Sequence, residues 1–271
     1  MAVPHHLRAR YVAPSSAVPA DALAYLAFGP DAPLPDDPRA FRVALRPLGA
    51  PDVAELWLGS GPVATGRDGD VAYAHDGTHL FGRHELDEAG AGGIERAAES
   101  AYRRVLAFTR ASEFPHLVRI WNYFDAINAG DADGERYRRF CVGRATALAD
   151  AYPPERLPAA TAIGRDGPGT ALQLYWVATR APGRAVENPR QESAYRYPRR
   201  YGPAAPSFSR AMALDGRLLL ISGTASVVGH ATNHVGDTLA QLDETLANFA
   251  SLCEAAPRAR RRTAPDRARR P

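Results

Sequence analysis

The sequence contains no lysine, so all 33 of its basic side chains are arginine. This absence excludes any chemistry that passes through a lysine Schiff base. We attribute it to codon bias in a GC-rich genome. Cysteine is also scarce, because Cys141 and Cys253 are too few for a disulfide framework. We therefore expect both thiols to be reduced, as in a cytoplasmic protein.

Long apolar runs are missing as well. No uninterrupted segment approaches the roughly 18 residues of a membrane span, and the N-terminus lacks the basic-then-apolar pattern of a signal segment. We therefore expect no membrane association and no export. The composition, 45% hydrophobic and 23% charged, is that of a globular protein, and 271 residues are enough for two domains.

The net charge of +3 comes from one end of the chain. Residues 257–271 carry seven arginines against one aspartate, which is more than the whole net charge. Basic tails of this kind occur in nucleic-acid-binding proteins. No aromatic stacking surface accompanies this one, so we expect a solvated, basic, disordered tail and no nucleic-acid partner.

Periodicity predicts an alternation of strands and helices through the middle of the chain. Short strand-like pieces (41–45 and 53–58) lie within a Pro- and Ala-rich leader. The predicted order is then β-α-β-α-β-β, with strands at 77–86, 117–124, 161–164 and 171–179 and helices at 94–109 and about 134–152. This order indicates an α+β layer with the helices on one face of the sheet.

After Pro182 the pattern begins again. Residues 215–223 repeat the turn, apolar strand and glycine of residues 76–82, and a helix at about 235–255 parallels the helix at 94–109. A repeat of this length indicates two copies of one domain. No counterpart of the later strands and second helix follows Ala256, so we expect the second copy to be incomplete, through truncation or a change of reading frame.

Several motifs in this order resemble the chorismatase family. They are RIWNYFDAIN and RYRRFCVGRA in the first half, and YRYPRRYGP, PSFSRA and ISGTASVVGH in the second. The stretch GPAAPSFSRAMALDGRLLLISGTAS also resembles the opening of RidA-like domains. The resemblance covers about residues 77–255.

The resemblance implies an α+β fold of two tandem RidA/YjgF-like (chorismate-mutase-like) β-sheet-plus-helix domains. Residues 1–185 would be the first domain with its leader, 186–256 the incomplete second domain, and 257–271 the tail. It also implies a chorismatase, which cleaves the enolpyruvyl ether of chorismate without metal or organic cofactor. The products would be pyruvate and a dihydroxycyclohexadiene carboxylate or a hydroxybenzoate. The protein would be a monomer or a homotrimer.

By the same resemblance, seven residues of the second half would bind substrate. Gln191, Tyr195 and Tyr201 would line the ring and hydroxyls, Arg210 would bind a carboxylate, and a close-packed wall would be formed by Gly223, Thr224 and Ala225. The protonating acid of the family has no match here, so the catalytic residue stays unassigned and we expect weak or absent turnover.

Other interpretations remain open. His230 and His234 have metal-ligand spacing, but no glutamate follows His230, and a loop hydrogen bond fits better. A triad of Ser226, His230 and Asp237 lacks a nucleophile elbow. The Arg- and Tyr-rich segment 195–201 could contact nucleic acid, although an anionic pocket uses the same residue types. Two other functions also remain, a non-catalytic RidA-like protein that binds small carboxylates and a RidA-type imine deaminase.

Overall fold

The computed structural model describes residues 7–15, 17–48, 52–165 and 171–256. The N-terminal part forms a four-stranded sheet in the order β1-β4-β2-β3. Its strands are β1 (Arg8–Val12), β2 (Ala22–Phe28), β3 (Ala40–Val43) and β4 (Val53–Leu58). The pieces at 41–45 and 53–58 are thus confirmed as strands. The fully apolar β2 was not predicted, and it pairs with both β3 and β4.

The centre of the molecule is a six-stranded sheet in the order β5-β6-β7-β10-β8-β9. Its strands are β5 (Ala64–Asp68), β6 (Val71–His75), β7 (His79–Asp87), β8 (His116–Asp125), β9 (Ala159–Arg165) and β10 (Ala171–Thr179). The long β10 pairs with β7 and β8, and β8 runs parallel to β9. All four strands predicted for this region are therefore confirmed.

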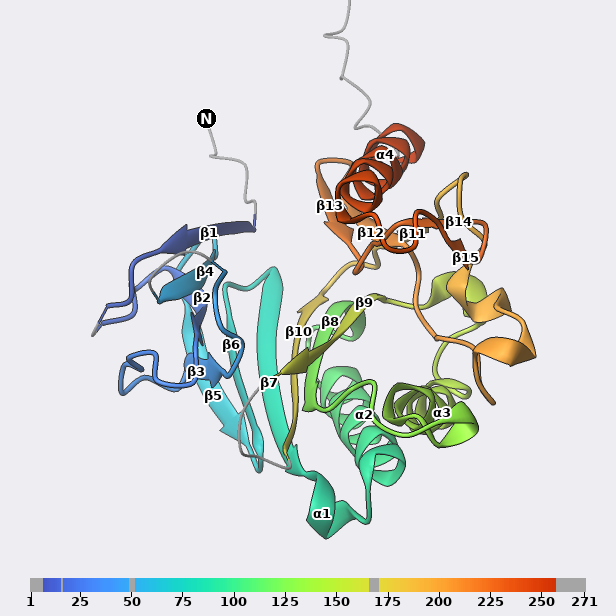
Figure 1. Cartoon of the computed structure of the whole chain (residues 1–271). Helices are drawn as coiled ribbons and strands as arrows, with labels where there is room; N and C mark the ends of the chain where they lie inside the picture. The colour runs from blue at the N-terminus through green and yellow to red at the C-terminus, as the bar shows by residue number, and fades with distance from the viewer. Residues whose placement is uncertain (1–6, 16, 49–51, 166–170, 257–271) are drawn as a thin grey trace, which may run out of the picture.

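Helices cover one face of this sheet, as the element order predicted (Figure 1). The short α1 (Glu88–Ala91) leads into α2 (Ile94–Ala111), and α3 (Arg136–Leu148) packs beside α2. Helix α3 is shorter than the predicted 134–152. A 3-10 turn (Ala132–Gly134) precedes it, and a second 3-10 turn (Pro154–Arg156) begins after Pro153. The two helices approach closely because Gly143 has no side chain to strike the backbone of α2.

The two faces of the central sheet build two cores. Alternate residues of β8 point to opposite faces. Ile120 and Phe124 pack under the helices, whereas Trp121 and Tyr123 pack against the N-terminal sheet. Leu23 and Trp57 belong to this second, inter-sheet core. The architecture is therefore three layers, sheet on sheet on helices, and Figure 1 shows the layers in that order.

The second half adds a smaller sheet in the order β11-β12-β13 (Arg184–Val186, Ala211–Leu214 and Leu218–Ile221). The predicted repeat of a turn and a strand corresponds to the β12–β13 hairpin, whose tight turn puts Asp215 and Gly216 at positive φ. The Ser222 hydroxyl accepts a hydrogen bond of 2.8 Å from the backbone N–H of Ala160, which ties this sheet to β9.

A two-stranded ribbon, β14 (Val227–Val228) and β15 (Ala231–Thr232), precedes the last helix, α4 (Thr238–Ala255). The Asp237 carboxylate caps α4 by accepting from the backbone N–H of Ala240. This helix buries Asn248 and Leu252, but Leu239, Leu242 and Leu246 stay more than half exposed. Among the described residues, no helix has the length and apolarity to cross a bilayer.

Candidate functional site

Most of the predicted site residues lie in a segment of irregular chain between β11 and β12. Prolines interrupt it repeatedly, so the backbone makes two 3-10 turns (Ala194–Arg196 and Arg199–Tyr201) and no longer helix. The segment packs on α3, where Gly202 lies against Arg138, and on the 3-10 turn before it, where the Arg199 guanidinium pairs with Asp133 at 2.6 Å. These contacts with the first half of the chain hold the segment, and with it the predicted site residues, in position.

Arg210 is the last residue of this segment. Its side chain is buried, and one Nη donates to the Glu192 carbonyl at 2.6 Å and to the Tyr197 hydroxyl at 2.8 Å. The rings of Tyr197 and Phe208 each lie 5.5 Å from the guanidinium carbon, which is cation–π distance. The Nε of Arg210 is buried without a partner among the described residues. The guanidinium is therefore held in place while keeping one donor unused.

Glu187, which the sequence analysis did not select, lies against Arg210. One of its carboxyl oxygens accepts from the backbone N–H of Arg210 at 3.3 Å, and the other is buried without a partner among the described residues. Burial raises the pKa of Glu187, although Ser193 and Arg210 act in the opposite direction. The structure thus supplies a carboxyl group that retains its proton more readily than usual. Glu187 follows β11 and Arg210 precedes β12, so the contact joins distant parts of the chain and no local sequence signal reveals it.

Two tyrosines and a histidine extend the cluster. The rings of Tyr197 and Tyr201 lie 5.2 Å apart, and the Tyr201 hydroxyl is 3.1 Å from Nδ1 of His230. Gln191 bridges to the backbone at Gly229, beside His230. Arg210, Tyr197, Tyr201, His230 and Gln191 therefore form one chain of contacts.

The remaining predicted residues do not join this cluster. Tyr195 packs against the helix-side core. Gly223 faces β9, where a Cβ would lie 3.2 Å from the Thr161 methyl group. Thr224 donates its hydroxyl to the Ser222 carbonyl, and the Ala225 carbonyl accepts from Asn248. Gln191 does belong to the cluster, but its side-chain amide already donates to the Val227 carbonyl at 3.1 Å.

The histidines hold loops, as the sequence analysis favoured. His230 contacts Arg200 and Tyr201, whereas His234 lies 3.1 Å from the Glu244 carboxylate. Within the described ranges, no group of three or more His, Cys, Asp or Glu side chains could hold a metal ion. Ser226 donates to the Asn233 carbonyl and Asp237 caps α4, so neither forms a triad with His230.

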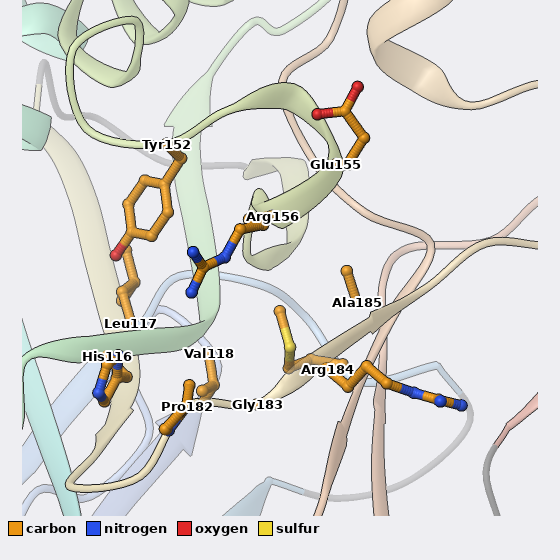
Figure 2. A pocket seen from close by; sticks show the side chains of 11 residues that line it. His116, Leu117, Val118, Tyr152, Glu155, Arg156, Pro182, Gly183, Arg184 and Ala185 are labelled. Carbon is orange, nitrogen blue, oxygen red and sulfur yellow. The ribbon is translucent and has the colours of Figure 1, made fainter.

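A separate cavity of about 190 Å³ opens where the start of β8 meets β11 and β12. Figure 2 shows the Arg156 guanidinium inside it beside Tyr152, whereas the charged ends of Arg184 and Glu155 point away. None of the seven predicted site residues lines this cavity. The polar cluster around Arg210 is therefore the better candidate site.

Comparison with known proteins identifies the family. Residues 55–178 match the family model described as "Chorismatase FkbO/Hyg5-like, N-terminal". A crystal structure of a chorismatase superposes with a TM-score of 0.79 at 32% identity, covering 92% of this chain and 77% of that chain. The chain belongs to the chorismatase family.

Curated chorismatases also resemble the chain. One from Streptomyces rapamycinicus is 43% identical over 208 residues, covering 73% of this chain and 61% of the relative. A 3-hydroxybenzoate synthase from Streptomyces hygroscopicus is 38% identical over 206 residues, covering 72% of this chain and 59% of the relative. The chain thus spans about three fifths of the length of these curated relatives. The aligned stretch is nevertheless long enough to confirm the family resemblance found in the sequence motifs.

Proposed function

We propose that the protein acts on chorismate and cleaves its enolpyruvyl ether without a cofactor. The products would be pyruvate and a dihydroxycyclohexadiene carboxylate or a hydroxybenzoate. The observation that carries the proposal is the similarity of fold to a solved chorismatase over 92% of this chain. The names of the curated relatives, two chorismatases and a 3-hydroxybenzoate synthase, support the same reaction class.

The cluster around Arg210 supplies groups that suit this chemistry. Chorismate is a dianion, and a guanidinium is the side chain best suited to bind a carboxylate. Arg210 keeps its Nε donor unused, the Tyr197 hydroxyl contacts its guanidinium, and the Tyr201 ring lies beside the Tyr197 ring. We assign Arg210 to one substrate carboxylate and the two tyrosines to the ring hydroxyls.

The reaction also needs a proton donor. Protonation of the enol ether at its methylene carbon gives an oxocarbenium ion, water adds to that cation, and the resulting hemiketal collapses to pyruvate and the ring alcohol. We assign the proton to the unpartnered carboxyl oxygen of Glu187, because its buried position raises the pKa of this group. The weak turnover expected from the sequence stays a prediction.

Pyruvate release from chorismate tests the proposal. We expect release above the uncatalysed background, with the ring product identified by chromatography, and we expect Arg210→Gln to abolish it. Arg184→Gln is the control, because its charged end points away even from the separate cavity that it borders (Figure 2). A folded protein that neither releases pyruvate nor binds chorismate in calorimetry would contradict the proposal.

Two outcomes would support the other functions left open. Binding of chorismate without pyruvate release would indicate a non-catalytic protein that binds small carboxylates. Ammonia release from an imino acid would indicate an imine deaminase. Each readout is separate, so one set of assays distinguishes the three functions.

We also propose the finer description of the chain as two tandem RidA/YjgF-like units, 1–185 and 186–256, acting as a monomer or homotrimer in the cytoplasm. Two parallels support the tandem units. A tight turn containing Gly77 or Gly216 begins a strand in each, and each has an 18-residue helix, α2 or α4. The free thiols of Cys141 and Cys253 suit a reducing compartment. Light scattering after size exclusion would give the oligomeric state.

A further inference from the structure

A second hollow, of about 280 Å³, lies on the other side of the central sheet from the helices. Its lining residues come from β1 and β4 of the N-terminal sheet, from β8 and from β13. It adjoins the predicted wall of the candidate site, because Thr161 contacts both Arg119 in this hollow and Gly223.

Arg119 stands in the wall of this hollow. Its side chain is 4% exposed, and its two Nη atoms donate to neutral oxygens, the Ile120 carbonyl and the Thr161 hydroxyl. The ion pairs between described residues do not include Arg119. Burial lowers the pKa of Arg119 to about 10, so the group is still a cation at neutral pH. A buried cation without a salt-bridge partner is costly, and an anion in the hollow would offset that cost beyond what the nearby Glu55 carboxyl supplies.

The walls of the hollow are aromatic. The Arg119 guanidinium lies 4.3 Å from the Trp121 ring, and Trp121 meets Trp57 edge to face at 5.3 Å. Tyr11 stands at the rim with 70% of its surface exposed, and β13 supplies Leu219 and Ile221 as an apolar wall. Flat aromatic walls beside one fixed guanidinium suit a planar ring that carries a carboxylate.

The other charged groups of the hollow are compatible with such an anion. Arg10 adds a second positive charge at the exposed edge. The Glu55 carboxyl accepts from the ring N–H of Trp57, and burial raises the pKa of Glu55 although Trp57, Tyr11 and Arg119 act in the opposite direction. The Glu55 carboxyl therefore takes up a proton more readily than an exposed glutamate does.

We propose that this hollow binds a planar aromatic monocarboxylate, with the carboxylate on Arg119 and the ring against Trp121 and Trp57. The site is separate from the cluster around Arg210, and the inference does not depend on the proposed reaction. An aromatic carboxylate product, if one forms, would belong to this class of ligand.

Tryptophan fluorescence provides the test. Of the three tryptophans, Trp57 and Trp121 line the hollow, whereas Trp176 is fully buried beside Phe108 on the helix side. We expect benzoate to quench the fluorescence of the whole chain in a saturable manner. Benzamide, which has the same ring without the charge, should bind at least about tenfold more weakly, since charge-assisted hydrogen bonds are the stronger ones. Calorimetry with the same two compounds gives the affinities directly.

Two variants locate the binding. Arg119→Gln should weaken benzoate at least about tenfold, for the same reason as benzamide. Because Arg119 is buried, a second variant, Tyr11→Ser at the exposed rim, tests the site without altering the core. It should weaken benzoate about threefold or more through lost aromatic contact. Arg184→Gln, on the separate cavity, should bind benzoate as the unaltered protein does.

The outcomes separate this site from the proposed active site. Benzoate binding that survives Arg119→Gln and Tyr11→Ser but is lost in Arg210→Gln would overturn the inference, and so would the absence of binding to the folded, unaltered protein. Pyruvate release is measured independently, so failure of the proposed function would not be mistaken for failure of this site.

Discussion

The Asp76 carboxylate shows how much one buried side chain organises in this protein. It accepts hydrogen bonds from the backbone N–H groups of Ser60, Thr78 and His79, at 3.1, 2.9 and 2.7 Å. Burial alone would raise the pKa of Asp76, but the His79 side chain and these backbone hydrogen bonds outweigh it and hold the pKa well below its usual range. One carboxylate thus joins the chain leaving β4 to the turn between β6 and β7.

Asp76→Ala should therefore lower the free energy of unfolding by about 2–4 kcal/mol, because three backbone N–H donors, two of them part-buried, lose a charged acceptor. Since the folded pKa lies below the unfolded one, the carboxylate stabilises the fold above about pH 4, and this contribution is lost as the pH falls. Denaturant titrations at several pH values measure both effects. Asp36→Ala, at an exposed position, is the control and should change stability by less than about 0.5 kcal/mol.

Glu187 carries the second prediction at this scale. If it donates the proton, Glu187→Gln should slow pyruvate release about a hundredfold or more, with a much smaller change in KM. The rate of the unaltered protein should fall as the pH rises through the raised pKa of Glu187, because the acid form is then lost. An unchanged rate in the Gln variant would remove Glu187 from the reaction.

Sequence reasoning selected part of the candidate site and missed the rest for a physical reason. Motifs identified Gln191, Tyr201 and Arg210, which the fold brings into one chain of contacts. Glu187 and Tyr197 were missed, because their roles come from contacts with Arg210 across irregular chain. Motif similarity does not show which residues of an irregular segment come into contact in the fold.

At the scale of elements, the packing of α2 on α3 depends on one residue without a side chain. A Cβ at Gly143 would collide with the Glu95 carbonyl in the facing helix. The helical spacing of both segments was readable from the sequence, but the distance between the two helices was not, because it depends on the partner helix. Similarly, the apolar run of β2 became interpretable only with its neighbours β3 and β4 in place.

Gly143→Ala should therefore destabilise the protein by about 1–3 kcal/mol, the usual cost of overpacking. The sign of this change in stability is informative, because alanine is a better helix former than glycine by about 1 kcal/mol and would stabilise an isolated helix. Chemical denaturation gives the difference. Gly134→Ala is the matched control, since nothing lies within 4 Å of the added carbon. Stabilisation by Gly143→Ala would mean that the helices can separate freely.

At the scale of the whole molecule, the inter-sheet core connects segments that are far apart in sequence. Leu23 and Trp57 of the N-terminal sheet pack in the same cluster as Tyr175 of the central sheet and Leu220 of β13. These three sheets share one core, so unfolding of any one of them would expose core residues of the other two. The Pro- and Ala-rich composition of the first 60 residues gave no indication of this role.

Unfolding should consequently be a single cooperative step across these layers. Tryptophan fluorescence follows the inter-sheet region through Trp57 and Trp121 and the helix-side core through Trp176, and far-UV circular dichroism follows the helices. We expect the two denaturation curves to coincide within error. An earlier fluorescence transition would show that the N-terminal sheet unfolds as an independent unit.

The two thiols differ in a way that makes α4 easy to monitor. Cys141 is buried and its burial raises the pKa of the thiol to about 11, whereas Cys253 is exposed. A maleimide dye would therefore attach to Cys253 without mutagenesis. Helical spacing places Cys253 on the same side of α4 as Leu242 and Leu246. The emission wavelength and anisotropy of that dye would change when a molecule binds to the exposed face of α4 that carries Leu242 and Leu246.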